Sequence, residues 1–299
     1  MSRVRPMETI RVRLTRPMRP AFLIPALGLC ALIRAHAGGL SASQSAKEIE
    51  DIGVIEEASP ETLGSKPAFR SNVQVRSEFT TNAKLTGNHR SGDLIFFPQV
   101  EVGFNTPLPH HFSFDIAARV ESGLYTQNSE RGFIGYSIIS TLDWRPKVNW
   151  PRLYLGAEPY RYDGFDTGER LSQAVGLTAG TDWGHAFNKG YSMVFVGYSF
   201  TNYFSDPTAD NRTQNRAIIG LTHQFNQRMV GTLFYQFTYS DFQNVDRSDY
   251  RHLLGANLTW QFTDKIFGNV ATTFADNDSS ADFASFQAFS LSLGVTVQF

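Results

Sequence analysis

Charged side chains that recur at even spacing are the residues of this sequence with the clearest chemical potential. Arg76 and Glu78 are two positions apart, and Arg119 and Glu121 repeat the pattern. Because successive side chains of a β-strand point to opposite faces, even spacing places both members of each pair on one face. Acidic and basic groups on one face suit an aqueous pore, where they orient ions and small polar solutes. The residues expected to line such a lumen and its constriction are Arg76, Glu78, Glu101, Asp115, Arg119, Glu121, Arg152 and Glu158.

The later part of the chain offers a different inner surface. Its corresponding positions are mostly neutral and polar, such as Thr232, Gln236 and Asn257, with Arg216 as the one basic exception. One wall of the lumen is therefore predicted to be charged and mixed in sign, and the other to be neutral. An alternative is that the mixed charges form buried ion pairs that close the lumen. Both interpretations stay open at this point.

The elements that must position these charges are strands, and the last strand is the most regular. The segment "FSLSLGVTVQF" (289–299) alternates strictly between apolar and polar residues and ends on Phe299. A period of two indicates a strand with one apolar and one polar face. Taken alone, this segment also suits an edge strand of a soluble sandwich, although an exposed apolar edge promotes aggregation.

Similar alternation recurs along the chain, between stretches rich in turn-forming residues. Short connections alternate with longer and more charged ones, as in transmembrane barrels with short periplasmic turns and longer extracellular loops. We therefore expect an all-β fold, a 12-stranded antiparallel transmembrane β-barrel with up-and-down topology over residues 68–299. Barrels of about eight strands are filled by side chains and those of about 16 contain a channel, so the count alone does not decide whether the lumen is open. The expected strands are 69–80, 93–104, 111–123, 133–144, 152–162, 171–183, 191–203, 214–225, 229–240, 251–262, 266–275 and 287–299.

The N-terminus has the three parts of a secretory signal peptide. Residues 1–20 are rich in arginine, residues 21–33 are apolar, and Ala35-His36-Ala37 is a small-x-small site, which predicts cleavage after Ala37. The apolar part is shorter than the roughly 20 residues that a membrane-spanning helix needs. Met18 is an alternative start, and a mitochondrial presequence or a buried helix are alternative interpretations. Residues 38–67 are polar and acidic, which predicts a flexible periplasmic extension.

Composition excludes several classes of function. The formal net charge is −1 and there is no basic block, so nucleic acid is not an expected partner. The one cysteine, Cys30, lies in the predicted signal, which leaves no thiolate for a metal site in the mature chain. His110 and His111 are too few for a metal site without further ligands, and no cofactor is expected.

An outer-membrane lipid hydrolase is a weaker alternative. Such an enzyme needs a nucleophile beside a base and an orienting group. His223 and His252 have the parity of the outer, lipid-facing side, and Ser240 and Ser248 lie in the strand end and loop that neighbour His252, whereas His223 is expected at the periplasmic rim. No motif joins these residues, so we expect no enzymatic activity.

Taken together, the signal, the alternating hairpins and the terminal "GVTVQF" resemble the outer-membrane β-barrel proteins of Gram-negative bacteria. More loosely, "SGDLIFFPQVEVGF" and "NLTWQF" are similar to the uncharacterised β-barrel porin families. The first resemblance implies that the barrel-assembly machinery reads the last strand, with Phe299, Val297, Val295 and Leu293 as its signal. It also implies location in the bacterial outer membrane and contact with membrane lipid. From the charged inner wall we expect passive diffusion of small hydrophilic solutes. A non-conducting structural barrel or an assembly or export scaffold is the alternative.

Overall fold

The computed structural model describes residues 67–299, except for residues 86, 88–90 and 148–149. The predicted signal peptide (1–37) and residues 38–66 of the predicted extension lie outside the described residues. Twelve strands account for most of the described chain. They are β1 (Ala68–Thr80), β2 (Asp93–Leu108), β3 (Phe112–Tyr125), β4 (Phe133–Trp144), β5 (Arg152–Gly164), β6 (Arg170–Phe187), β7 (Ser192–Asp206), β8 (Arg212–Asn226), β9 (Met229–Phe242), β10 (Arg247–Gln261), β11 (Ile266–Ser279) and β12 (Phe286–Gln298).

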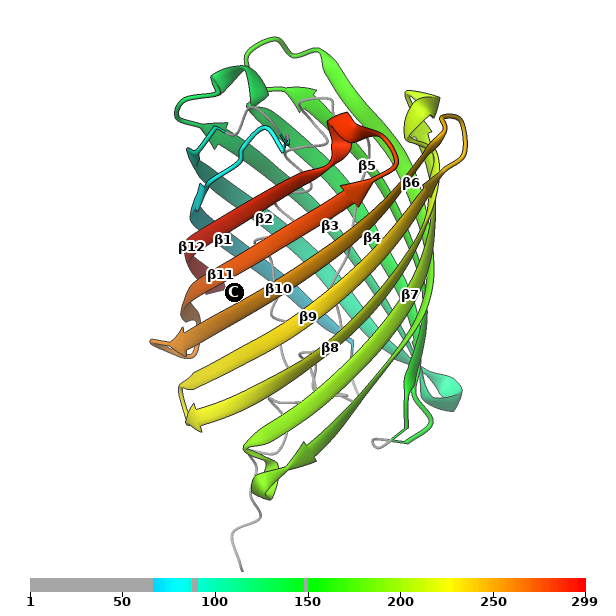
Figure 1. Ribbon diagram of the computed structural model, residues 1–299. Coiled ribbons are helices and arrows are strands. Elements are labelled where there is room, and N and C mark those ends of the chain that lie inside the picture. Colours follow the sequence, from blue (N-terminus) through cyan, green and yellow to red (C-terminus); the bar gives the residue numbers. More distant parts are fainter. Residues whose placement is uncertain (1–66, 86, 88–90, 148–149) are drawn as a thin grey trace, which may run out of the picture.

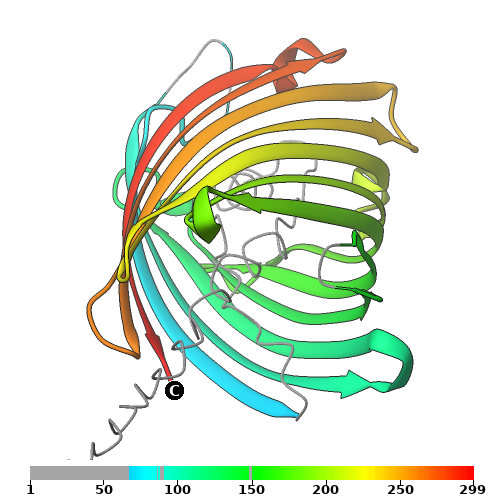
Figure 2. The same ribbon diagram turned by 90° about the horizontal axis from the view of Figure 1, so that it is seen from below.

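Each strand pairs antiparallel with its neighbours in sequence, and β1 pairs with β12 to close the barrel. The closing register places Val75 opposite Val295 and Glu78 opposite Ser292. Figure 1 shows the tilted strands from the side, and Figure 2 shows the ring that they form. Closure pairs the edges of the first and last strands, which removes the edge that an open sheet would expose. The predicted 12-stranded up-and-down barrel is confirmed.

Loop and turn lengths differ less than the sequence predicted. We call the end at which β1 begins and β12 ends the turn end, and the opposite end the loop end. Several strands run past their expected bounds: β10 begins at Arg247, which pairs with Phe242 of β9, so only residues 243–246 connect these strands at the loop end. At the turn end, the connection 145–151 is as long as the loop-end connection 126–132. Ladder pairing thus continues into residues whose polarity indicated a loop.

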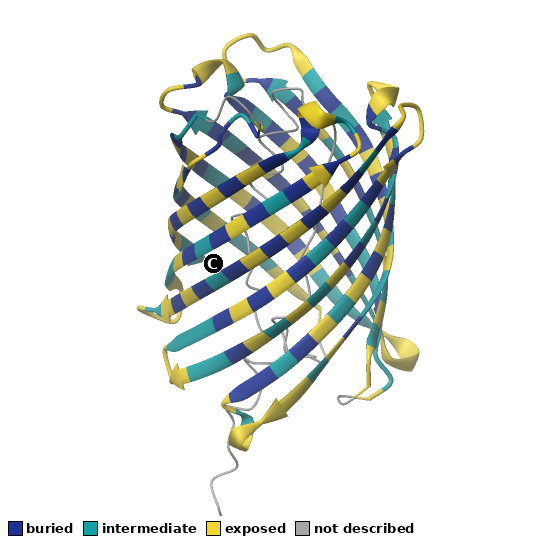
Figure 3. Ribbon diagram, in the orientation of Figure 1, coloured by how far each residue is buried: buried dark blue, intermediate teal, exposed yellow. Residues whose placement is uncertain are grey.

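The two faces of the wall differ as the alternation predicts. Outward side chains are apolar and exposed: Leu291, Leu293 and Val295 of β12 have exposed fractions of 44%, 58% and 48%. Their inward neighbours Ser290 and Ser292 are buried. Figure 3 shows this alternation of exposed and buried residues along each strand. An apolar band around a closed barrel is the surface that a bilayer requires.

The helical elements among the described residues are short 3-10 turns in the connections. None of them has the length and apolar content needed to cross a membrane. They are η1 (Pro109–His111), η2 (Ser129–Arg131), η3 (Asn188–Gly190), η4 (Thr208–Asp210) and η5 (Asp282–Ala284).

Candidate functional site: the charged inner face of the barrel

All eight predicted lumen residues have the inward parity of their strands. They lie on β1, β2, β3 and β5, and Arg152 is the least enclosed of them. The side chains of the other seven are buried: Arg76, Glu78, Glu101, Asp115, Arg119, Glu121 and Glu158.

One ion-pair cluster joins β1, β2 and β3 in the half of the barrel toward the turn end. Arg119 donates to Glu101 at 2.9 Å from Nη2 and 3.1 Å from Nε. Arg70 donates to both carboxylate oxygens of Asp115 and lies 3.7 Å from Glu101. The sequence analysis did not include Arg70, although its even parity with Arg76 was a usable signal. The cluster binds three neighbouring strands together through their side chains.

A second cluster continues around the wall on β4, β5 and β6. Arg152 donates from Nε to Asp182 at 2.8 Å and lies 3.3 Å from Asp143, while Arg145 lies 3.4 Å from Asp182. Asp143, Arg145 and Asp182 were not among the predicted site residues. We call the two clusters together the paired belt; its four arginines and four acids sum to a formal charge of zero. The belt comprises Arg70, Glu101, Asp115, Arg119, Asp143, Arg145, Arg152 and Asp182.

Further charged residues occupy the same wall toward the loop end. Arg76 lies 3.7 Å from Glu78, and its guanidinium stands 4.4 Å from the ring centroid of Phe97. Glu121 accepts a hydrogen bond of 2.8 Å from the hydroxyl of Tyr162. These contacts hold the charged side chains against the wall, because each is fixed by a neighbour on it.

The opposite wall is not neutral, and the prediction that Arg216 is its one basic residue was wrong. Arg212 of β8 and Arg247 and Arg251 of β10 are also buried on the inner face, together with Asp249. Arg212 and Arg247 were missed because β8 and β10 begin earlier than predicted. Arg251 lay within a predicted strand and shares the parity of the inward Asn257, so that signal was present in the sequence.

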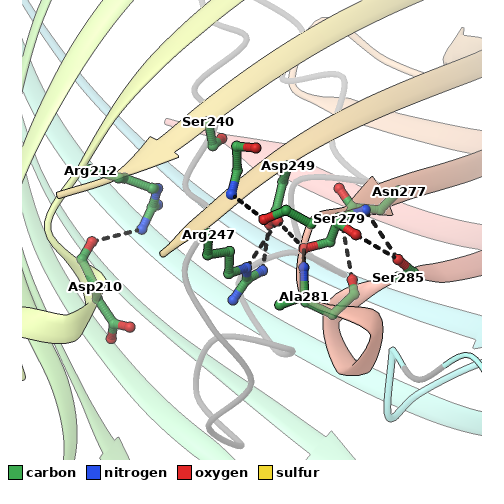
Figure 4. A network of polar contacts seen from close by, with 12 residues as sticks. Asp210, Arg212, Ser240, Arg247, Asp249, Asn277, Ser279, Ala281 and Ser285 are labelled. Atoms are coloured by element: carbon green, nitrogen blue, oxygen red, sulfur yellow. Dashed lines mark hydrogen bonds and ion pairs between the residues drawn. The ribbon is translucent and has the colours of Figure 1, made fainter. Parts of the chain in front are cut away.

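Aromatic rings and hydrogen bonds hold the two arginines nearest the loop end. The guanidinium of Arg212 lies 4.3 Å from the ring centroid of Tyr203 and 5.8 Å from that of Phe242. Arg247 lies over the same Phe242 ring at 4.3 Å and forms an ion pair with Asp249. Asp249 also accepts a hydrogen bond of 2.6 Å from Ser279. Figure 4 shows how this network connects β10 to the β11–β12 connection.

Comparison with known proteins agrees with this architecture. Residues 169–299 match the family model described as "Putative beta-barrel porin 2". The chain is a bacterial outer-membrane β-barrel. No curated protein matches it.

Solved structures similar to this outer-membrane barrel include the translocator domain of the autotransporter NalP from Neisseria meningitidis. It has 12% identity and a TM-score of 0.47, with 80% of this chain and 90% of that chain covered. The KdgM porin in complex with disordered oligogalacturonate has 8% identity and a TM-score of 0.44, covering 76% and 99%. OmpT of Vibrio cholerae has 8% identity and a TM-score of 0.39, covering 80% and 100%.

The histidines and serines considered for catalysis are dispersed over the barrel. His252 is exposed on the outer face, where its Nδ1 lies 2.7 Å from the hydroxyl of Tyr235. Ser240 is buried on the inner face, so it lies on the other side of the wall from His252. His223, on the outer face near the turn end, lies 2.9 Å from Ser192 and packs against Phe225. Within the described residues, no group of three or more His, Cys, Asp or Glu is placed to hold a metal ion.

Proposed function

We propose that this outer-membrane barrel is a channel for the passive diffusion of small hydrophilic solutes. The proposal rests on the apolar outer face and on the many charged and hydrogen-bonding side chains of the inner face, which lie beside a buried apolar cluster that includes Phe97, Phe195 and Phe234. Polar interiors of this kind hydrate solutes during passage, whereas an interior packed with apolar side chains would exclude them.

The paired belt determines the charge selectivity of the proposed channel. Its arginines and acids contact one another, and their formal charges cancel. A solute that passes the belt therefore meets alternating charges with no net sign. The predicted constriction residues Glu101, Asp115, Arg119 and Arg152 thus restrict size and maintain the shape of the wall, and they select weakly by charge.

The same belt favours a second candidate function, a non-conducting structural or scaffold barrel. Ion pairs within β1–β3 and within the β4–β6 region stiffen the wall, which is useful whether or not solutes pass. Conduction distinguishes the two candidates.

Planar-bilayer recording of the purified, refolded barrel is the test. We expect discrete conductance steps in the wild type. Arg119→Glu should increase preference for cations, because it changes the formal charge of the belt from zero to −2. A matched control is Arg161→Glu, since Arg161 pairs with Asp163 at an exposed position on the outer face. A barrel that inserts but never conducts would favour the structural role.

A further inference from the structure

The arginines of β8 and β10 form an ordered array on the inner face. Arg216 and Arg251 both lie opposite Thr238 of β9, one on each side of it. Arg212 and Arg247 lie in the same way on both sides of Phe242. Neighbouring strands are about 4.8 Å apart, so the backbones of Arg216 and Arg251 are roughly 10 Å apart. That separation allows two long side chains to converge on one ligand above Thr238.

Arg251 is the member of the array whose donors are least used. Its exposed fraction is 4%, and its Nε and Nη1 atoms have no hydrogen-bond acceptor among the described residues. A buried guanidinium with unused donors is unfavourable unless an acceptor completes it. Carboxylate and phosphate are the groups that match its planar fork.

The side chains around Arg251 favour an anion further. Thr238 accepts a hydrogen bond from Nε2 of Gln236 at 3.2 Å, which leaves the proton of its hydroxyl available to donate. Ser240, one step nearer the loop end on β9, accepts from Nε2 of Gln214 at 3.3 Å in the same way. Two hydroxyl donors therefore lie between the arginines of β8 and those of β10.

The local charge is net positive. Among the described residues of β7 to β12, the charged side chains on the inner face are Arg212, Arg216, Arg247, Arg251 and Asp249, with a formal sum of +3. Asp249 is engaged by Arg247 and Ser279. Asp210, in the adjoining η4 turn, offers its backbone oxygen to Arg212.

Acids on the opposite wall near the loop end have partners of their own. Glu121 is bonded to Tyr162, and Glu78 faces Arg76. Asp93 accepts from the backbone N–H groups of Gln127 and Asn128 at 3.0 and 2.9 Å. Asp249 forms an ion pair with Arg247 of the array, and the formal charge of the described inner face of β7 to β12 stays net positive.

We infer that Arg216, Thr238 and Arg251 form a binding site for the carboxylate or phosphate group of an anionic solute. Arg212 and Arg247 attract the anion toward this site from the loop end. The inference deepens the proposed function, because it assigns the channel a preferred class of solute and places the selection away from the paired belt.

Calorimetric titration of the detergent-folded barrel with inorganic phosphate tests the site without requiring conduction. We expect saturable binding in the wild type, weakened by about tenfold or more in Arg251→Gln and in Arg216→Gln, as for loss of a hydrogen bond to a charged group. Arg170→Gln is the matched control, since Arg170 lies at the same end but is exposed and paired with Asp206. Heat-modifiable gel migration establishes that each variant is folded.

Three outcomes would overturn the site: no saturable binding, binding unchanged in both array variants, or equal weakening in Arg170→Gln, which indicates only a diffuse surface potential. Bilayer recording separates this inference from the proposed function. A barrel that conducts but does not bind phosphate would contradict the proposed anion site and would be consistent with the proposed channel. A barrel that does not conduct but binds phosphate through Arg251 would contradict the proposed channel and would support the anion site.

Discussion

Arg119 of β3 lies directly opposite Glu101 of β2 and donates two hydrogen bonds to the same carboxylate oxygen. Both side chains are buried on the inner face, with exposed fractions of 8% and 9%. The register of one strand pair thus brings together two charges that are 18 residues apart in sequence. Ion pairs of this kind also stabilise the barrel wall, because they hold neighbouring strands together in addition to the backbone hydrogen bonds of the sheet.

Breaking this pair from one side should destabilise the barrel. Arg119→Met leaves Glu101 buried without its main partner, and we expect a loss of about 3 kcal/mol in the free energy of unfolding, at the low end for a broken buried pair. The loss stays at the low end because Arg70 still lies 3.7 Å from Glu101. Denaturant unfolding followed by gel migration measures it.

The double variant Arg119→Met, Glu101→Leu provides the decisive comparison. It removes both charges together, so most of the lost stability should return. Arg161→Met is the control for an exposed ion pair, which is worth at most about 1 kcal/mol. A double variant no more stable than Arg119→Met would show that packing, and not the ion pair, is responsible.

Phe299 is expected to act as a signal for assembly. Its side chain is 68% exposed, and its backbone N–H bonds to the carbonyl of Ser71 at 2.9 Å, beside the closing pair of strands. Deleting Phe299, or Phe299→Asp, should strongly reduce insertion into the outer membrane and leave export intact. Folded barrel and periplasmic precursor are quantified by heat-modifiable migration after fractionation.

Phe262→Asp is the matched control for Phe299, because Phe262 is also an exposed aromatic at the turn end, with an exposed fraction of 53%. If contact with lipid alone explains the role of Phe299, both changes should reduce the yield equally. A normal yield from the truncated chain would contradict the assembly signal.

A charged residue in the middle of a strand on the outer face should lower the stability of the barrel in a membrane. Leu291 is 44% exposed on β12 and lies opposite Phe79 of β1. In a bilayer, Leu291→Arg should cost about 2–4 kcal/mol if the position lies near the midplane, and less toward either interface. Unfolding in lipid vesicles measures the difference.

Val245→Arg tests whether that cost comes from the membrane. Val245 has a similar exposed fraction, 42%, but lies in the loop 243–246, beyond the strands. We expect little change in stability there. Equal losses at the two positions would argue against burial of Leu291 in lipid.

Local periodicity in the sequence determined the strands and their two faces. The alternation in "FSLSLGVTVQF" predicts which side chains of β12 point outward, because successive residues of a strand alternate by geometry alone. The same parity placed Arg76, Glu78 and Arg119 on the inner face. Strand ends were less predictable, since Arg247 and Asp249 are polar residues that read as a loop yet continue the ladder of β10.

Only the tertiary structure decided which inward charges meet. Arg70 and Asp115 are 45 residues apart and lie on different strands, and their contact depends on the register of β1, β2 and β3. The array formed by Arg216, Thr238 and Arg251 depends likewise on two registers shared by β9. Alternation assigns a side chain to the inner or the outer face, but the register of paired strands sets its position along the barrel axis. Contacts between strands depend on both, so the paired belt and the anion site could not be derived from spacing alone.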